Sequence, residues 1–239
     1  MRMRKRHNLE PRMERCAEYM VSEPEMLRGS WKKGEQPLLL EIGCGKGSFT
    51  CALAASRPEA QLVAVEKVPD AMILAMERAK REERENVRFI DGDAAKLHEI
   101  FEPGEVDEIY INFCDPWPKS RDAKFRLTAP SFLRIYATIL SDGGSVRLKT
   151  DNLPLFRWSA EQFRAEGWQI TELTENLHAN GIVGILTDYE TRFLEQGVQI
   201  KSLTAQKTSQ TKDMLAGTPP RLRDSALEDA YGSWKEETE

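Results

Sequence analysis

A glycine-rich turn that begins with an acid is the segment of this 239-residue chain that most clearly suggests chemistry. The turn reads Glu41-Ile42-Gly43-Cys44-Gly45-Lys46-Gly47. Glycines let a backbone approach a ligand closely and adopt positive φ. In doubly wound folds such a turn lies at the carboxyl end of the sheet, where nucleotides bind. We therefore expect Gly43, Gly45 and Gly47 to contact a nucleotide-like ligand, the structural alternative being a tight turn without one.

The spacing within the turn favours one kind of nucleotide. G-x-G-x-G differs from the G-x-G-x-x-G of dinucleotide sites, and Glu41 would meet a pyrophosphate with negative charge. This favours S-adenosylmethionine over NAD. Glu66 follows Gly47 by 19 residues, where an acid can accept hydrogen bonds from both ribose hydroxyls, although it could be only a surface acid. Asp93 is equally suited to accept from the adenine amino group or to cap the next segment.

A second unusual segment is Asn112-Phe113-Cys114-Asp115-Pro116-Trp117-Pro118-Lys119. Prolines on both sides of Trp117 stiffen the backbone, so Asp115 and Trp117 would be held over the cofactor site at low entropic cost. An acid beside an aromatic face suits a purine, whereas the structural alternative is that Trp117 fills the core. Four cations follow, and they could hold the phosphates of the same substrate: Lys119, Arg121, Lys124 and Arg126.

The elements that position these residues alternate between strands and helices. Apolar runs predict strands over 38–42, 61–66, 87–90, 109–113, 145–149, 168–173 and 198–203. Helical spacing predicts helices over 47–56, from Pro69, from Thr128 as N-cap to Leu140, and over 153–165. Strands that alternate with helices predict an α/β fold: a doubly wound, mostly parallel, seven-stranded sheet. We expect a basic arm over 1–36, a catalytic domain over 37–204 and a loosely ordered polar tail over 205–239.

Composition narrows the class of protein further. The chain is 40% hydrophobic and 31% charged, which is ordinary for a globular protein. No apolar run approaches the roughly 20 residues that span a bilayer, and no apolar segment follows the basic start, so we expect no membrane partner and a cytoplasmic location. The four cysteines lack metal spacing, so we expect free thiols and no metal.

The net charge of −5 is unevenly distributed along the chain. Six acids and one lysine from Asp224 to Glu239 account for it, which leaves the rest near neutral. A basic cluster at the start is either a solvated face or a contact for nucleic acid: Arg2, Arg4, Lys5, Arg6, Arg12 and Arg15. The net charge therefore does not exclude a nucleic-acid partner.

Together, four segments in this order resemble the bacterial tRNA (guanine-7-)-methyltransferase family. They are the glycine turn, Phe113 to Lys119, Leu148-Lys149-Thr150-Asp151-Asn152 and Thr187-Asp188-Tyr189-Glu190. The resemblance runs from about Leu38 to Leu203. It implies S-adenosylmethionine as methyl donor, a tRNA substrate and 7-methylguanosine in the variable loop as product.

The resemblance also implies roles for single residues. The cofactor residues would be Glu41, Glu66, Asp93 and Asp115, with Asp115 also catalytic. The substrate residues would be Lys119, Asp151, Thr187, Asp188, Tyr189 and Glu190. Asp151 and Thr187 could instead be helix caps. The basic loop departs from the family because Phe125 replaces an expected cation, and the acidic tail has no counterpart.

The hypothesis for the reaction is a direct displacement by the guanine N7 lone pair. Asp115, helped by Asp151 and Glu190, would accept hydrogen bonds from the amide and amino edge of the guanine. Three alternatives remain: a methyltransferase for another RNA, a small molecule or a protein, a silent tRNA-binding protein, and a nicotinamide enzyme. The sequence is compatible with a monomer or a homodimer.

Overall fold

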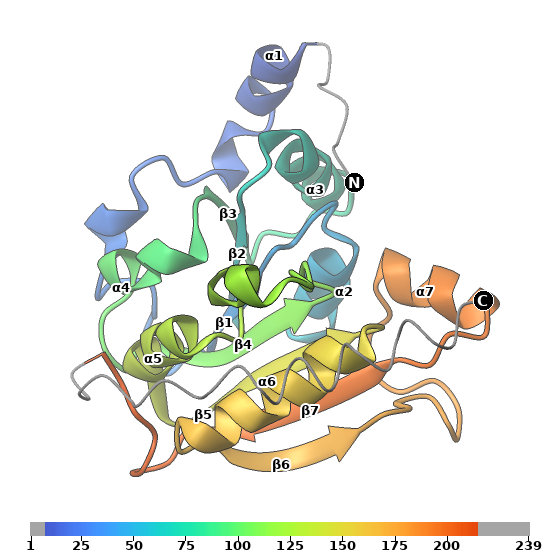
Figure 1. The fold of residues 1–239 in the computed structure, drawn as a ribbon. Coiled ribbons are helices and arrows are strands. Elements are labelled where there is room, and N and C mark those ends of the chain that lie inside the picture. The colour runs from blue at the N-terminus through green and yellow to red at the C-terminus, as the bar shows by residue number, and fades with distance from the viewer. Residues whose placement is uncertain (1–7, 215–239) are drawn as a thin grey trace.

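The computed structural model describes residues 8–214, and one seven-stranded sheet runs through this part of the chain (Figure 1). The strand order is β3-β2-β1-β4-β5-β7-β6. The pairs from β3 to β5 are parallel, whereas β7 is antiparallel to both β5 and β6. The strands are β1 Leu38–Ile42, β2 Gln61–Glu66, β3 Val87–Asp91, β4 Val106–Asn112, β5 Leu140–Thr150, β6 Gln169–Thr174 and β7 Lys201–Gln206. The predicted doubly wound, mostly parallel sheet is confirmed.

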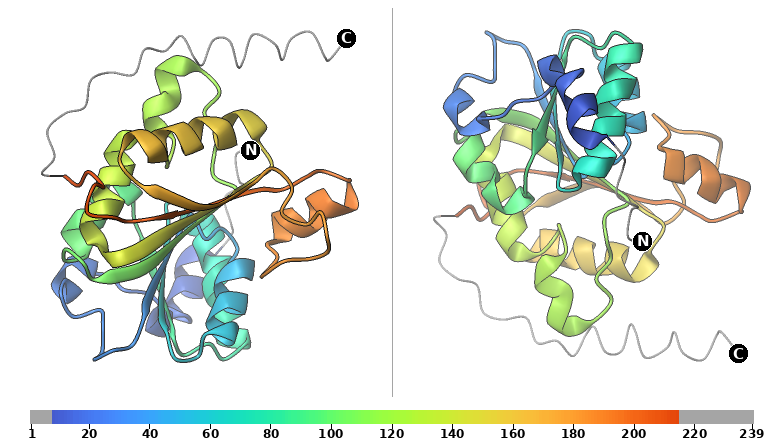
Figure 2. Two further views of the ribbon diagram at one scale, coloured as in Figure 1. Left: turned by 90° about the horizontal axis from the view of Figure 1, so that it is seen from below. Right: turned by 90° about the horizontal axis from the view of Figure 1, so that it is seen from above.

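Helices cover both faces of the sheet (Figure 2). The α-helices are α1 Leu9–Glu14, α2 Ser48–Ser56, α3 Pro69–Arg81, α4 Leu97–Ile100, α5 Pro130–Ile139, α6 Leu153–Ala165 and α7 Asp188–Glu195. Short 3₁₀ helices are η1 Ala17–Tyr19, η2 Pro24–Leu27, η3 Ala94–Lys96 and η4 Ser120–Phe125. Within residues 8–214, no helix is both long and apolar enough to cross a bilayer.

The side chains of β1 show why an apolar run forms a central strand. Leu38, Leu40 and Ile42 pack into the cluster under α4, α5 and α6, whereas Leu39 packs into the cluster under α1, α2 and α3. Successive side chains of a strand point to opposite faces, so a strand covered on both faces is apolar throughout. This strand and β2 have the bounds predicted from the sequence.

The described part of the N-terminal segment packs on the domain. Arg12 in α1 donates to both oxygens of Glu77 in α3, at 2.7 and 2.6 Å. The N–H of Val21 donates to the carbonyl of Phe89 in β3 at 2.9 Å, and Trp31 is buried in the core. Residues 8–36 are therefore attached to the domain at several points. Four cations of the predicted basic cluster, Arg2, Arg4, Lys5 and Arg6, lie outside the described residues, as does the acidic tail from Asp224.

Several predicted element boundaries were wrong. The strand β4 begins at Val106 rather than Ile109, and β5 begins at Leu140 rather than Ser145. Thr128 does not cap α5: Ala129 is the N-cap, Pro130 begins the helix, and the Thr128 hydroxyl lies 2.7 Å from that of Ser159 in α6. The last strand was placed too early, because Gly197 adopts a positive φ of 73° in a turn and the ladder begins only at Lys201.

Candidate active site

The glycine turn between β1 and α2 leaves open space where a ligand would approach. Gly43, Gly45 and Gly47 all have positive φ, of 79°, 56° and 74°. A Cβ at Gly43 or Gly45 would meet nothing within 4 Å, whereas one at Gly47 would lie 2.6 Å from the Cβ of Ala75. Gly43 and Gly45 thus line free space, while Gly47 is required for α3 to pack against the turn.

Glu66 is positioned by backbone donors at the carboxyl end of β2. One oxygen accepts from the N–H of Gly45 at 2.8 Å and the other from the N–H of Val68 at 2.9 Å. Each carboxylate oxygen has a further lone pair to offer. Glu66 is therefore fixed against the glycine turn and can still accept from a pair of ribose hydroxyls.

Glu41 is almost completely buried beneath the same turn. The hydroxyl of Thr50 donates to it at 2.5 Å and the amide of Asn112 lies 3.5 Å away. Burial raises the pKa of Glu41 to about 7, in spite of these two donors. With a pKa of about 7, Glu41 is partly protonated near neutral pH, and its bonds join β1 to α2 and β4. Its contact with the cofactor stays a prediction.

Asp93 caps the short helix that follows β3. Its carboxylate accepts from the N–H of Ala95 at 3.0 Å and from the ammonium of Lys67 at 2.7 Å. The Ala95 N–H, and then Lys67, hold the pKa of Asp93 below its ordinary value. The capping interpretation is thus seen directly, and contact with an adenine stays a prediction.

Asp115 follows β4 in a loop whose backbone is strained on both sides of it. Phe113 and Trp117, which are not glycines, adopt positive φ of 53° and 44°. Such strain persists only where the surroundings enforce it, and it clusters at functional sites. Asp115 is exposed and has no hydrogen bond or ion pair to another described residue. Its carboxylate is available to a ligand.

Asp115 and Asp151 both lie near the buried thiol of Cys114. Burial raises the pKa of the Cys114 thiol to about 12, and the charges of Asp115 and Asp151 contribute. Asp151 does not cap α6, because Asn152 accepts from the N–H of Leu155 at 2.8 Å and serves as N-cap. The structure thus brings Asp115 and Asp151 to the ends of adjacent strands β4 and β5.

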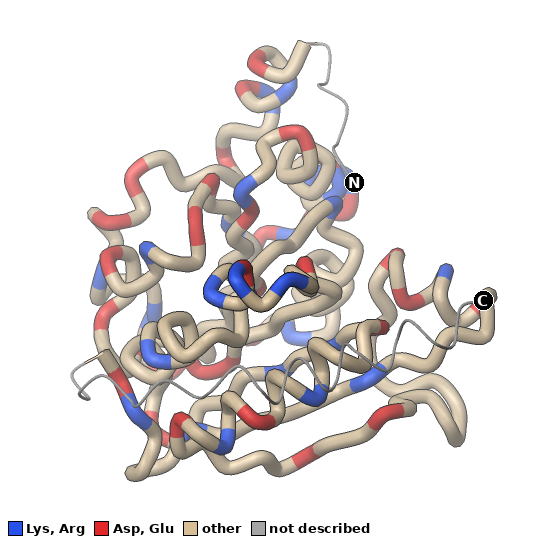
Figure 3. The backbone as a smooth tube through the Cα atoms, in the orientation of Figure 1, with Lys and Arg blue, Asp and Glu red and all other residues tan. Residues whose placement is uncertain are grey.

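The basic loop presents three of its four predicted cations to solvent. Lys119, Arg121 and Lys124 are exposed on and beside η4, where Figure 3 shows basic residues gathered in front of the sheet. Arg126 is fully buried: its guanidinium lies 4.4 Å from the ring centre of Trp158 and donates to the carbonyls of Pro116 and Trp117. The predicted phosphate contact by Arg126 was therefore wrong.

The segment from Thr187 to Glu190 begins α7 beyond the carboxyl end of β5 (Figure 1). Thr187 and Glu190 form a capping box, with bonds of 2.9 and 3.1 Å. Asp188 lies 3.8 Å from Arg78 of α3, and the exposed Tyr189 stacks on Phe113 with ring centres 6.1 Å apart. The capping interpretation of Thr187 is thus seen directly.

Glu190 cannot bind guanine in this arrangement, because it is fully buried and both oxygens are in use. Lys149 donates to them at 3.0 and 3.2 Å, and Nε2 of His178 lies 2.8 Å from one. Val183 N–H donates to Nδ1 of His178, which places the ring proton on Nε2. The predicted contact between Glu190 and guanine was therefore wrong. Through Lys149 and His178, Glu190 instead anchors α7 and the 178–185 loop to β5.

Sequence reasoning did not single out several residues that shape the site. Lys149 and His178 hold Glu190, Trp158 supports Arg126, and Thr50 holds Glu41. A signal for Lys149 did exist, since it is the only cation in Leu148 to Asn152, one of the four segments that carry the family resemblance. His178 and Trp158 carried no signal, because their partners are 12 and 32 positions away.

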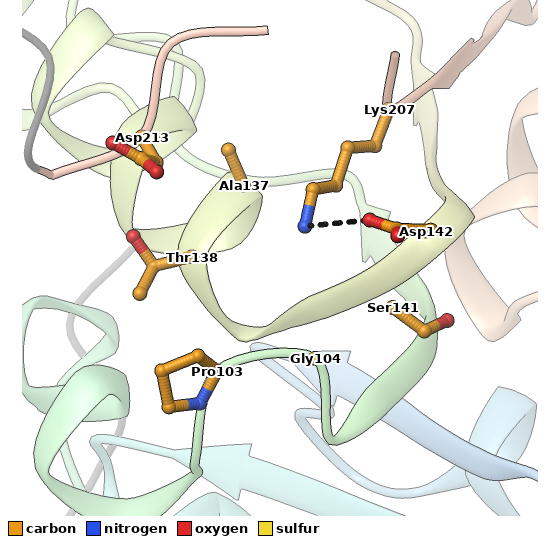
Figure 4. Close-up of a pocket in the computed structure, with 8 residues that line it drawn as sticks. All are labelled: Pro103, Gly104, Ala137, Thr138, Ser141, Asp142, Lys207 and Asp213. Atoms are coloured by element: carbon orange, nitrogen blue, oxygen red, sulfur yellow. Dashed lines mark ion pairs between the residues drawn. The ribbon is translucent and has the colours of Figure 1, made fainter. Parts of the chain in front are cut away.

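A pocket of about 480 Å³ lies elsewhere, at the amino end of β4 and β5 (Figure 4). Lys207 and Asp142 form an ion pair of 3.7 Å at its mouth. Its lining includes none of the predicted site residues: Pro103, Gly104, Ala137, Thr138, Ser141, Asp142, Lys207 and Asp213. Within residues 8–214, no three His, Cys, Asp or Glu side chains gather as a metal site would require.

The fold and the glycine turn define a class of protein. Residues 35–203 match the family described as putative methyltransferase. The 16S rRNA methyltransferase KamB has the same fold, with a TM-score of 0.59 at 18% identity over 78% of this chain and 93% of that one. A SAM-dependent methyltransferase from Aquifex aeolicus matches with a TM-score of 0.53 at 11% identity, over 85% and 100%. The chain is an S-adenosylmethionine-dependent methyltransferase by class.

Curated relatives narrow the class to one family. The tRNA (guanine-N(7)-)-methyltransferase of Lachnoclostridium phytofermentans is 40% identical over 193 residues, which are 79% of this chain and 90% of that protein. The one from Bacillus subtilis is 35% identical over 204 residues, 84% and 96% of the two chains. This chain belongs to the tRNA (guanine-N(7)-)-methyltransferase family.

Proposed function

We propose that this chain methylates N7 of a guanine in the variable loop of tRNA, using S-adenosylmethionine. The observation that carries the proposal is Asp115 after β4, beside the open glycine turn: it is exposed and has no partner among residues 8–214. The family membership supports the substrate class. The proposal takes the predicted catalytic unit of 37–204, extended to Gln206 because β7 runs to that residue. It also includes a cytoplasmic location and action as a monomer or homodimer.

Methylation at N7 requires positioning more than acid–base chemistry. The cofactor supplies an electrophilic methyl group on its sulfonium, and N7 of guanine already exposes a lone pair, so no proton has to leave first. Aligned approach of reacting groups can lower a barrier by roughly 7–11 kcal/mol. The residues of this chain must therefore hold the purine in one orientation and exclude others.

The cofactor would lie against the glycine turn. Gly43 and Gly45 leave room for it, and Glu66 has acceptor capacity for its ribose hydroxyls. Asp93 is the candidate for the adenine end because it follows the neighbouring strand β3. These residues fit S-adenosylmethionine in charge and shape.

Asp115 and Asp151 would orient the guanine. Both carboxylates lie without a partner among the described residues, at the ends of adjacent strands. Each could accept from the amide N–H or the amino group of the base, at about 1.5–3 kcal/mol per charge-assisted bond. The opposite edge of the purine, which carries N7, would then face the methyl group.

The experiment measures transfer of labelled methyl from S-adenosylmethionine to unmodified tRNA transcripts, with nucleoside mass spectrometry of the product. The wild type should form 7-methylguanosine. Asp115→Asn, which keeps the shape and removes the charge, should lower kcat by about tenfold to a hundredfold, because one charge-assisted bond is weakened. Its affinity for the cofactor should fall far less than kcat.

Asp142→Asn is the matched control, since Asp142 is fully exposed at the opposite end of the sheet. It should leave turnover unchanged. Near-normal turnover of Asp115→Asn would contradict the role given to Asp115. Cofactor binding without methyl transfer to any tRNA would instead favour a small molecule or another RNA as substrate.

A further inference from the structure

Two large aromatic side chains stand exposed on the loop that follows Asp115. Trp117 is 38% exposed and Phe125 49% exposed, with ring centres 5.4 Å apart and planes inclined by 52°. Aromatic side chains of this size are mostly buried in folded proteins. An adjacent pair at the surface beside a candidate active site therefore calls for a partner.

The loop beneath the pair is held rigidly. The buried Arg126 packs on Trp158 and donates to the carbonyl oxygen of Trp117 at 2.9 and 3.2 Å and to that of Pro116 at 3.0 Å. Proline on each side of Trp117 restricts the backbone further. Both rings are thus presented by an ordered backbone, which reduces the entropy lost when a partner binds.

Three exposed cations lie on the same loop as the two rings. Lys119, Arg121 and Lys124 are exposed on the same loop, and Nζ of Lys124 lies 5.1 Å from the centre of the Phe125 ring. Aromatic faces interleaved with cations match what unpaired nucleic acid requires, since bases stack on rings and phosphates contact Lys or Arg. An apolar protein partner would have to desolvate these charges, so the composition favours RNA.

We propose that Trp117 and Phe125 form a stacking platform for an unpaired base that flanks the methylated guanine. The proposal rests on the proposed function and extends it to recognition of the RNA strand. Asp115 and Trp117 are separated by one residue, so a base on the platform is a neighbour of the base held by Asp115. Phe125 thereby contributes by stacking at a position where the resemblance leads one to expect a cation.

Contacts between cations and phosphates weaken as the salt concentration rises, whereas stacking on a ring depends much less on salt. The two contributions to tRNA binding can therefore be separated. The dissociation constant of unmodified tRNA is measured from 50 to 300 mM salt with the protein saturated by S-adenosylhomocysteine. Phe125→Leu, which keeps an apolar side chain but removes the ring, should weaken binding about five- to a hundredfold at every salt concentration. The slope of log affinity against log salt should stay unchanged.

Three further variants complete the design. Phe125→Tyr keeps a ring and should restore binding to within about twofold of the wild type. Lys124→Gln should reduce the magnitude of the salt slope by about 0.7–0.9, as expected for one lost phosphate contact. Met26→Ala, at an apolar residue that is 78% exposed on η2, is the matched control and should change neither quantity.

Each outcome decides between the two proposals. If wild-type protein neither binds nor methylates tRNA, the proposed function fails. If the wild type is active and Phe125→Leu binds tRNA normally, or changes only the salt slope, the platform is refuted and the function stands. Failure of Phe125→Tyr to restore binding would likewise overturn the stacking role.

Discussion

Three carboxylates at one edge of the sheet have three different environments. Glu41 is buried and its pKa lies near 7, Glu66 is held by two backbone N–H groups, and Asp115 is exposed without a described partner. Environment assigns different roles to chemically similar acids. We infer that Glu41 supports the site from beneath, while Glu66 and Asp115 are placed to meet ligands.

Glu41 should make the stability of the protein depend on pH. Its folded pKa of about 7 lies above the ordinary value of 4.5, so the folded state binds the proton more tightly than the unfolded state. The resulting stabilisation is fully present below pH 4.5 and is lost as the pH rises through 7. Between pH 5 and 8 the loss amounts to about 2–3 kcal/mol.

Glu41→Gln should remove this dependence, because glutamine keeps an oxygen for Thr50 and does not titrate. We expect its free energy of unfolding in urea to fall about 2–3 kcal/mol less than that of the wild type between pH 5 and 8. Glu59→Gln, at an exposed acid, serves as the control. Parallel pH profiles for Glu41→Gln and wild type would contradict the buried, titrating carboxyl.

Residue types that imply chemistry can be located from the sequence, but their partners cannot. Arg126 belongs to a run of cations that predicts a solvated, phosphate-binding loop, yet its guanidinium packs on Trp158, 32 positions later. Glu190 belongs to a motif implied to bind substrate, yet Lys149 and His178 occupy its oxygens. The sequence shows which side chains are charged. Whether they are buried depends on contacts between segments that are distant in the sequence.

At the scale of elements, strands buried on both faces were the most predictable. The bounds of β1 and β2 follow from continuous apolar runs, because parallel strands between two layers of helices have no polar face. The strand β7 was less predictable, since it is antiparallel and its core residues Leu203 and Ala205 alternate with the polar residues Ser202, Thr204 and Gln206. The start of α5 was mispredicted because Thr128 bonds with Ser159 rather than with its own helix.

Gly47 joins the glycine turn to the packing of two helices, which can be tested by substitution. Gly47→Ala would add a Cβ 2.6 Å from Ala75 Cβ and 2.7 Å from its Cα, at a φ of 74°. The positive φ costs an alanine about 1–2 kcal/mol, and displacement of α3 adds an overpacking cost of about 1–3 kcal/mol. We expect a total loss of about 2–5 kcal/mol in urea unfolding.

Gly34→Ala separates these two contributions. Gly34 also has a positive φ, of 66°, but a Cβ there would meet nothing within 4 Å. This variant should therefore lose only the conformational cost of about 1–2 kcal/mol. Equal losses for the two variants would mean that contact with Ala75 is not what requires glycine at position 47.

At the scale of the whole molecule, the candidate site exists only when the sheet is assembled. Its residues come from the carboxyl ends of β1, β2, β4 and β5, which are brought together by the parallel registers of the sheet. The unfolded chain therefore cannot offer this site to a ligand. Any ligand that binds there should stabilise the entire fold by mass action.

S-adenosylhomocysteine at a free concentration of 100 times its Kd should add about 2.7 kcal/mol to the free energy of unfolding. For a domain of this size that corresponds to a rise in Tm of about 5–11 °C, which differential scanning fluorimetry would measure. Glu66→Gln has one acceptor oxygen in place of two, so its Tm should rise less at the same concentration of S-adenosylhomocysteine. A higher concentration should restore the full rise in Tm. Glu59→Gln should behave like the wild type, since it is far from the turn. At a fixed ligand concentration, the rise in Tm depends on the affinity of the ligand for the folded state. If Glu66→Gln showed the same rise in Tm as the wild type, Glu66 would not bind the ribose.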